Sequence, residues 1–228
     1  MAPSIDDRVH TFAEHGLYDG LFLMRDDQTG TFWDHMTGDA VYGGLVGQKL
    51  DVSNLLQSTV AQVIGQDPDA LITLSDQAIR RDSDMSLRGL LSIVGGRLNG
   101  MFQSTVANED RRLEQMDIGL GVWRGDQARY YPYNDIVADG AAIVDEFHGR
   151  RVLVYLDPTA FALSALYVDS RRFTWDGKVL RLSDGTYIEG GILHDTDGER
   201  IEMDRPLQVF TRWYGFSQTF RETEVYGR

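Results

Sequence analysis

Histidine, carboxylate and aromatic residues gather in a glycine-rich block at residues 26–50. If this block is extended, Trp33 and His35 point to one face of a strand and Asp34 to the other. Histidine titrates near neutral pH, so His35 suits proton transfer or metal ligation, with Asp34 or Asp27 as the supporting carboxylate. We therefore predict a small-molecule pocket beside this block. Its predicted catalytic residues are His35, Asp34, Asp27 and, from the second half of the chain, Tyr131.

The same residues also have a purely structural interpretation. Asp26 and Asp27 would build a hairpin turn, Trp33 would fill the core, and His35 would donate to a backbone carbonyl. This alternative makes the chain a non-catalytic ligand-binding or scaffold protein. Whether the chain is an enzyme is therefore left open.

Three histidines are candidate metal ligands. His10 and His15 lie near His35 in the sequence, and together with a carboxylate they suit a divalent metal. The compact spacing His-x-x-x-His does not occur, which favours a structural role for them. A divalent metal is thus the one cofactor that the residues suggest. No Walker loop and no Gly-x-Gly-x-x-Gly sequence indicates a nucleotide or flavin.

Aromatic residues of the second half form another candidate site. Such side chains can line a pocket for a planar or sugar-like ligand, while Arg129 and Arg212 hold an anionic group. Alternating aromatic residues are also ordinary sheet packing, and both interpretations stay open. The predicted ligand-binding residues are Trp33, Tyr42, Arg129, Trp213 and Tyr214.

Composition excludes several classes of function. With no cysteine, the chain has no disulfide, thiolate nucleophile or iron–sulfur cluster. No Gly-x-Ser-x-Gly sequence marks a serine nucleophile. A net charge of −13 disfavours nucleic acid and anionic membranes as partners. The acidic run at 194–202 does not fit the ligand register of a calcium loop, so we expect a hairpin turn there. The absence of a signal-like N-terminus and of a long apolar run predicts a cytoplasmic location.

The hydrophobic pattern predicts an α+β fold that is mainly antiparallel β, as a meander or barrel-like sheet, with two or three helices in the first half. We expect one domain over 1–228, whose lobes 1–100 and 117–228 share a core and are joined by residues 101–116. Helices are expected from Asp51 or Ser53 to residue 65 and from about Asp84 to Leu98, and one short charged helix is expected in the link. Strands are expected at 71–74, 118–123, 128–131, 143–147 and 152–156, with Asp-Gly hairpins at 176, 184 and 197.

Two phrases carry a family resemblance. Asp26-Asp-Gln-Thr-Gly-Thr-Phe-Trp33 followed by Thr37-Gly-Asp-Ala-Val-Tyr-Gly-Gly-Leu-Val-Gly47, and later Gly121-Val-Trp-Arg-Gly-Asp-Gln-Ala-Arg-Tyr-Tyr-Pro132, resemble the uncharacterised prokaryotic family called domain of unknown function 3179. The resemblance implies a fold with an internal pseudo-repeat, and it leaves function and oligomeric state open. This chain lacks the family's Cys-Pro-Leu-Cys-Gly segment and looks like a shortened member, so no role of those cysteines carries over.

Overall fold

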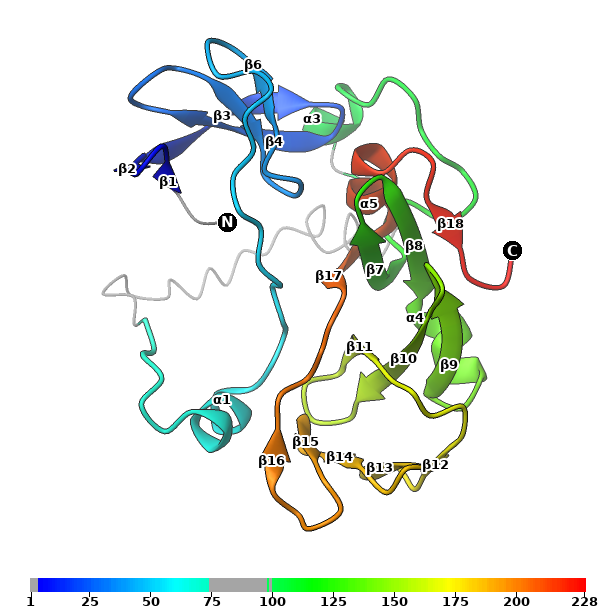
Figure 1. Cartoon of the computed structure of the whole chain (residues 1–228). Coiled ribbons are helices and arrows are strands. Elements are labelled where there is room, and N and C mark those ends of the chain that lie inside the picture. The colour runs from blue at the N-terminus through cyan, green and yellow to red at the C-terminus, as the bar shows by residue number, and fades with distance from the viewer. Residues whose placement is uncertain (1–3, 74–97, 99) are drawn as a thin grey trace, which may run out of the picture.

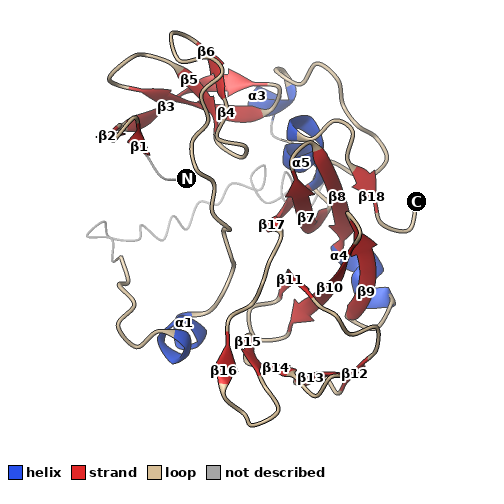
Figure 2. Ribbon diagram, in the orientation of Figure 1, coloured by secondary structure: helices blue, strands red, loops and turns tan. Residues whose placement is uncertain are grey.

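The computed structural model describes residues 4–73, 98 and 100–228 (Figure 1). Strands dominate and the helices are short, as Figure 2 shows. An N-terminal sheet lies at the top left of Figure 1, and the sheets of the second half lie at the right and along the bottom. The chain between them runs as a long connection to helix α1 (Val60–Gln66), which lies beside strand β16 (Arg200–Ile201). This arrangement confirms the predicted α+β class with mainly antiparallel strands, and the described part of the chain contains meander-like sheets and no closed barrel.

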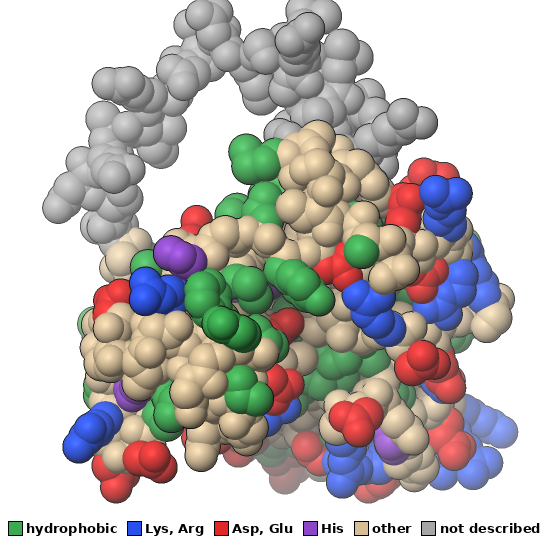
Figure 3. Space-filling model, turned by 90° about the horizontal axis from the view of Figure 1, so that it is seen from above, with side chains coloured by type: hydrophobic (Ala, Val, Ile, Leu, Met, Phe, Trp, Pro, Cys, Tyr) green, Lys and Arg blue, Asp and Glu red, His purple; other side chains and the backbone are tan. Residues whose placement is uncertain are grey.

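The N-terminal sheet is an antiparallel meander in the order β3-β4-β5-β6, beside the two-stranded pair β1–β2. Its strands are β1 (Ser4–Ile5), β2 (Arg8–Val9), β3 (Phe12–Tyr18), β4 (Leu21–Asp26), β5 (Phe32–Asp34) and β6 (Ala40–Tyr42). A small core of Ile5, Trp33, Ala40 and Leu50 holds it together. Hydrophobic side chains also gather on the surface seen from above in Figure 3. This part of the chain exposes Tyr18, Phe22, Val41, Tyr42 and Val46.

The first-half helices differ from the expectation. Helix α1 (Val60–Gln66) begins after a capping box at Thr59, so the predicted start at Asp51 or Ser53 is wrong. The reason is tertiary. The Asn54 side chain accepts a hydrogen bond from the backbone N–H of Gln208, and Leu55 bridges Val209, which keeps this segment extended.

Two more predicted elements of the first half are not formed as expected. Residues 71–73 form no strand, and Leu71 is 99% exposed. In the link, helix α3 (Gly100–Gln103) contains no charged residue, so it is not the charged helix that was predicted. The charged residues that follow α3 form ion pairs two positions apart, as in Arg112–Asp110, which is not a helical spacing. The helix predicted over 84–98 lies outside the described residues except for Leu98.

Two sheets and two helices form the main core of the second half. One sheet has the order β17-β7-β8-β18 and the other β11-β10-β9; only β18 pairs in parallel, with β8. All four strands predicted between 118 and 156 are confirmed. The elements are β7 (Ile118–Arg124), β8 (Gln127–Pro132), α4 (Tyr133–Ala138), β9 (Ala142–Phe147), β10 (Arg150–Asp157), β11 (Ala162–Tyr167), β17 (Leu207–Arg212), α5 (Trp213–Thr219) and β18 (Glu224–Val225).

A five-stranded meander completes the fold. Its strands are β12 (Phe173–Trp175), β13 (Val179–Leu182), β14 (Tyr187–Glu189), β15 (Ile192–His194) and β16 (Arg200–Ile201). The predicted Asp-Gly turns connect strands here, with positive φ at Gly177, Gly185 and Gly198. In the last turn the Asp195 carboxylate accepts the N–H groups of Asp197 and Glu199, so it builds the hairpin as expected.

The sheets bury three apolar clusters, and α5 contributes to the most aromatic one. Gly121 on β7 lies against Phe216 of α5, since a Cβ at Gly121 would come within 2.1 Å of that ring. Met36 and Val52 of the first half pack against this cluster. The division into lobes and the internal repeat stay predictions. In the described part of the chain, no helix is long and apolar enough to cross a membrane.

Candidate functional site

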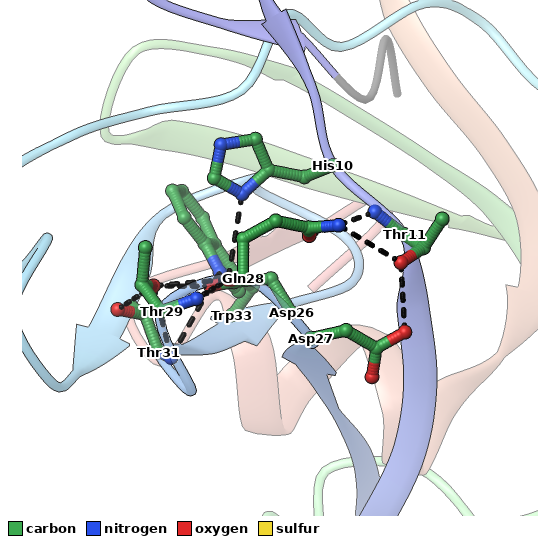
Figure 4. Close-up of polar contacts among 8 residues, drawn as sticks. All are labelled: His10, Thr11, Asp26, Asp27, Gln28, Thr29, Thr31 and Trp33. Carbon is green, nitrogen blue, oxygen red and sulfur yellow. Dashed lines mark hydrogen bonds and ion pairs between the residues drawn. The ribbon is translucent and has the colours of Figure 1, made fainter.

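The predicted block is organised by one buried carboxylate, that of Asp26, which has no exposed surface. The Trp33 indole N–H donates to its Oδ2 atom at 2.9 Å, and the Thr29 backbone N–H donates to Oδ1 at 2.6 Å (Figure 4). The Thr29 hydroxyl and the Thr31 N–H complete the set. These donors come from the hairpin between β4 and β5 or from β5 itself, so the carboxylate closes this hairpin from inside.

The turn geometry explains why the sequence folds this way. Asp26-Asp-Gln-Thr-Gly30 and Asp34-His-Met-Thr-Gly38 repeat one pattern eight residues apart. In each copy the aspartate carboxylate accepts the N–H of the threonine three residues later, at 2.6 and 2.8 Å. The glycine N–H groups donate back to the aspartate carbonyls at 3.0 Å, and both glycines have positive φ. The pattern Asp-x-x-Thr-Gly is therefore a turn signal used twice.

The second copy determines where His35 lies. β5 ends at Asp34, and His35 is in the turn, so the expected strand alternation of Trp33 and His35 does not apply. The Asp34 carboxylate is occupied by the N–H groups of Met36 and Thr37. His35 is half-buried, and its Nδ1 lies 3.0 Å from the carbonyl oxygen of Phe22. This is the contact that the structural interpretation predicts.

Asp27 lies in a third network. It is exposed, and its carboxylate accepts the hydroxyl of Thr11 at 2.7 Å (Figure 4). The Asp27 N–H also donates to the Thr11 carbonyl. These contacts fasten the hairpin to the start of β3. The predicted catalytic residues His35, Asp34 and Asp27 therefore have separate partners and are not brought together.

The electrostatics of Asp26 favour a permanently charged group. Burial alone would raise the pKa of this carboxyl, but hydrogen bonds from Trp33, Thr29 and His10 outweigh it and hold its pKa far below the usual range. His10 is itself buried, and its Nδ1 lies 3.4 Å from Asp26 Oδ1. A carboxylate so strongly stabilised in its ionised form is a poor acceptor of a substrate proton near neutral pH.

The three candidate histidines do not converge. His10 contacts Asp26, His15 lies edge-on to Phe32 with ring centroids 5.3 Å apart, and His35 contacts a carbonyl. Within the described ranges, no three His, Asp or Glu side chains are placed to hold a metal ion. The structure therefore does not assemble the predicted His10, His15 and His35 site.

Two predicted residues of the second half do share a partner. Asp145 Oδ2 accepts Arg129 Nη1 at 2.7 Å and the Tyr131 hydroxyl at 3.0 Å. Arg129 also donates to Glu224 on β18, from Nε at 2.8 Å and from Nη2, and to the carbonyl of Glu146. The cluster joins β8, β9 and β18. The sequence prediction missed Asp145 and Glu224, because Glu224 reaches Arg129 through the pairing of β18 with β8, and Asp145 reaches it from β9 of the other sheet.

Protonation in this cluster is fixed. Burial raises the pKa of Tyr131 strongly, and the negative charge of Asp145 adds to the effect. Burial would lower the pKa of Arg129, but hydrogen bonds to Glu224 and Asp145 raise it. Tyr131 therefore stays a neutral phenol and Arg129 a cation, which suits a structural ion-pair network more than proton transfer.

The other predicted ligand-binding residues are dispersed. Trp213 is fully buried and donates its indole N–H to the Asp110 carbonyl at 2.9 Å. Tyr214 is half-buried near Gly20, and burial raises its pKa. Trp33 belongs to the Asp26 network, whereas Tyr42 is 72% exposed with its ring beside Phe32. These residues do not form one pocket.

A pocket that the sequence prediction missed lies between α1 and the five-stranded meander. Its walls include Gln66 of α1, Ile192 of β15, residues 200–203 and Arg205, and its volume is about 470 Å³. α1 is held there by polar contacts: Gln62 donates to Asp157 at 2.7 Å and to the Gly190 carbonyl at 3.1 Å. The residues that mark this pocket in the sequence are the two glutamines four residues apart, Gln62 and Gln66, and the pair Gly190-Gly191. Their positions in the sequence do not reveal that they meet, because only the folded chain brings them together.

Comparison with known proteins identifies the family. Residues 2–216 match the family described as "Protein of unknown function (DUF3179)", so the chain belongs to this family, and the resemblance in the sequence is confirmed. No curated protein and no solved structure matches the chain.

Proposed function

We propose that this protein is a non-catalytic binding protein for a small ligand. The observation that carries the proposal is the Asp26 carboxylate, which is fully buried, ionised and surrounded by donors of its own hairpin. It is the carboxylate beside His10, and the pair is used to hold the N-terminal sheet together. In this proposal Asp26 and His10 have a structural role.

Ligand binding is favoured over a scaffold role by the pocket beside α1. Volumes of about 300–1,000 Å³ are typical of small-molecule sites, and this pocket is lined by both apolar and polar side chains. The hypothesis of an enzyme that uses His35 stays a prediction. It needs a base that faces a substrate, and His35 faces the carbonyl of Phe22.

A thermal-shift screen against neutral, cationic and anionic metabolites tests the proposal. A ligand that binds only the folded state raises the melting temperature with its concentration. We expect at least one such compound, and we expect His35→Ala to bind it with unchanged affinity. If a compound were instead converted by the wild-type protein, and conversion were lost in His35→Ala, the enzyme hypothesis would replace this one. A screen without any shift would refute ligand binding.

A further inference from the structure

The pocket beside α1 has an apolar wall and a basic one. Its apolar side chains are Leu56, Ile192, Leu193, Ile201 and Met203. Its basic side chains are Arg200 and Arg205, against a single acid, the exposed Glu202. The protein has a net charge of −13, yet this pocket has more basic than acidic side chains. Its excess positive charge suggests an anionic ligand.

Arg205 is half-buried and has no carboxylate partner in the described part of the chain. Its Nη1 donates to the Ser164 hydroxyl at 2.6 Å and to the Ala165 carbonyl at 2.9 Å, and its Nη2 lies 2.6 Å from the sulfur of Met203. All of these partners are neutral. By contrast, Arg129, which is similarly buried, is paired with two acids. A partly desolvated guanidinium without a counter-ion attracts an anion.

The neighbours of Arg205 hold it in place. Ser164 lies on β11, opposite Tyr155 of β10, so the guanidinium is fixed against the sheet. Burial raises the pKa of Tyr155, and the positive charge of Arg205 partly opposes that effect. Arg200 adds a second cation whose Nη1 donates to the Gln66 carbonyl, and it too lacks a carboxylate partner among the described residues.

We propose that this pocket binds a small amphiphilic carboxylate, whose charged group pairs with Arg205 and whose hydrocarbon chain lies on Leu56, Ile192 and Ile201. This inference rests on the proposed binding function and specifies its ligand class. A monoanion is preferred to a phosphate dianion, because the overall negative charge and Glu202 repel a second negative charge. Arg200 provides additional attraction for the anion.

Calorimetric titration with sodium octanoate tests the inference, with octanamide as the neutral analogue. We expect wild-type protein to bind octanoate and to bind octanamide more weakly. Arg205→Gln should weaken octanoate binding by at least about tenfold, the usual effect of losing a hydrogen bond to a charged group. Arg124→Gln is the matched control, because it removes one exposed arginine outside the pocket and gives the protein the same net charge as Arg205→Gln.

Two further variants keep the test decisive if Arg205→Gln fails to fold. Arg200 and Leu56 are exposed, so Arg200→Gln and Leu56→Asp should fold, and both should weaken octanoate binding. Equal binding of octanoate and octanamide, or unchanged binding in all three pocket variants, would overturn the inference. If the wild-type protein does not bind octanoate but binds another compound of the thermal-shift screen, the inference fails and the proposed function stands. If nothing binds, both fail.

Discussion

The indole N–H of Trp33 donates to the Asp26 carboxylate at 2.9 Å, and neither side chain has exposed surface. The pair joins the centre of β5 to the end of β4. It links the turn pattern at residues 26–30 to the small core of the N-terminal sheet, in which Trp33 is the largest side chain. Both partners are needed, because a buried carboxylate that loses a donor keeps its desolvation cost.

Trp33→Phe should therefore destabilise the protein by about 2–4 kcal/mol, through the lost donor and the smaller ring. Urea unfolding gives the free energy directly. Tyr42→Phe is the control, since it removes a hydroxyl from an aromatic ring that is 72% exposed, and it should change stability by less than about 0.5 kcal/mol. Equal effects of the two substitutions would contradict the role assigned to Trp33.

Asp26 predicts acid sensitivity. Its folded-state pKa lies below the ordinary value of 3.8, so the unfolded chain takes up this proton more readily than the folded protein. The stabilisation is complete above that ordinary value and is lost as the pH falls toward the lower folded-state pKa. Melting temperatures between about pH 5 and pH 2 should therefore fall more steeply for wild type than for Asp26→Asn.

Asp34→Asn provides the comparison for this acid effect. Asp34 occupies the equivalent position of the second turn but is only half-buried. This variant retains Asp26 and should keep the steep wild-type dependence on pH. A wild-type slope that survives in Asp26→Asn would show that other carboxyl groups dominate acid unfolding.

Gly191 is predicted to be essential for the position of α1. Its φ is +78°, and a Cβ there would lie 3.0 Å from both Asp157 Oδ2 and Gln62 Nε2. Gly191→Ala should therefore cost about 1–2 kcal/mol for the backbone, plus the disturbance of the Gln62–Asp157 hydrogen bond. Gly177→Ala has the same kind of backbone cost, with φ at +90° and no atom within 4 Å. Urea unfolding should show a larger loss for Gly191→Ala, and equal losses would refute the contact.

Arg129 should contribute more than a surface arginine. Arg129→Gln leaves Asp145 and Glu224 without their cation, and we expect a loss of about 1–3 kcal/mol in the free energy of unfolding. Arg111→Gln breaks an ion pair whose arginine is 84% exposed, for which about 0–1 kcal/mol is usual. A comparison of the two by thermal unfolding checks the difference. An Arg129→Gln variant as stable as Arg111→Gln would show that the network is energetically neutral.

The strands of the second half were predictable because local signals agree there. Apolar runs such as 152–156 are bounded by turns, and Asp-Gly pairs supply the positive φ that hairpins need. The start of α1 was not predictable, since Asp51 and Ser53 are good caps in isolation, and the segment is held extended by the contacts of Asn54 with Gln208 and of Leu55 with Val209. Tertiary contacts over 150 residues of chain leave no mark in a local pattern.

The candidate site shows the same division. The turn role of Asp26 and the carbonyl contact of His35 could be anticipated from residue types, and the repeated Asp-x-x-Thr-Gly pattern would have placed His35 in a turn. The meeting of Arg129 and Tyr131 with Asp145 depends on contact between two sheets, because β8 and β9 belong to different ones. The pocket depends on α1 reaching a meander more than a hundred residues later, which no spacing rule encodes.

The pairing of β7 with β17 has a consequence for the order of folding. Residues 118–124 form a hairpin with 127–132, but their other partner is residues 207–212, and the whole of β9 to β16 lies between them in the chain. Closing so long a loop costs conformational entropy before the contacts between β7 and β17 can form, and this slows folding. During synthesis, one edge of β7 therefore stays unpaired while the three-stranded and five-stranded sheets are made. This unpaired strand edge is where a nascent chain of this protein is most exposed to aggregation.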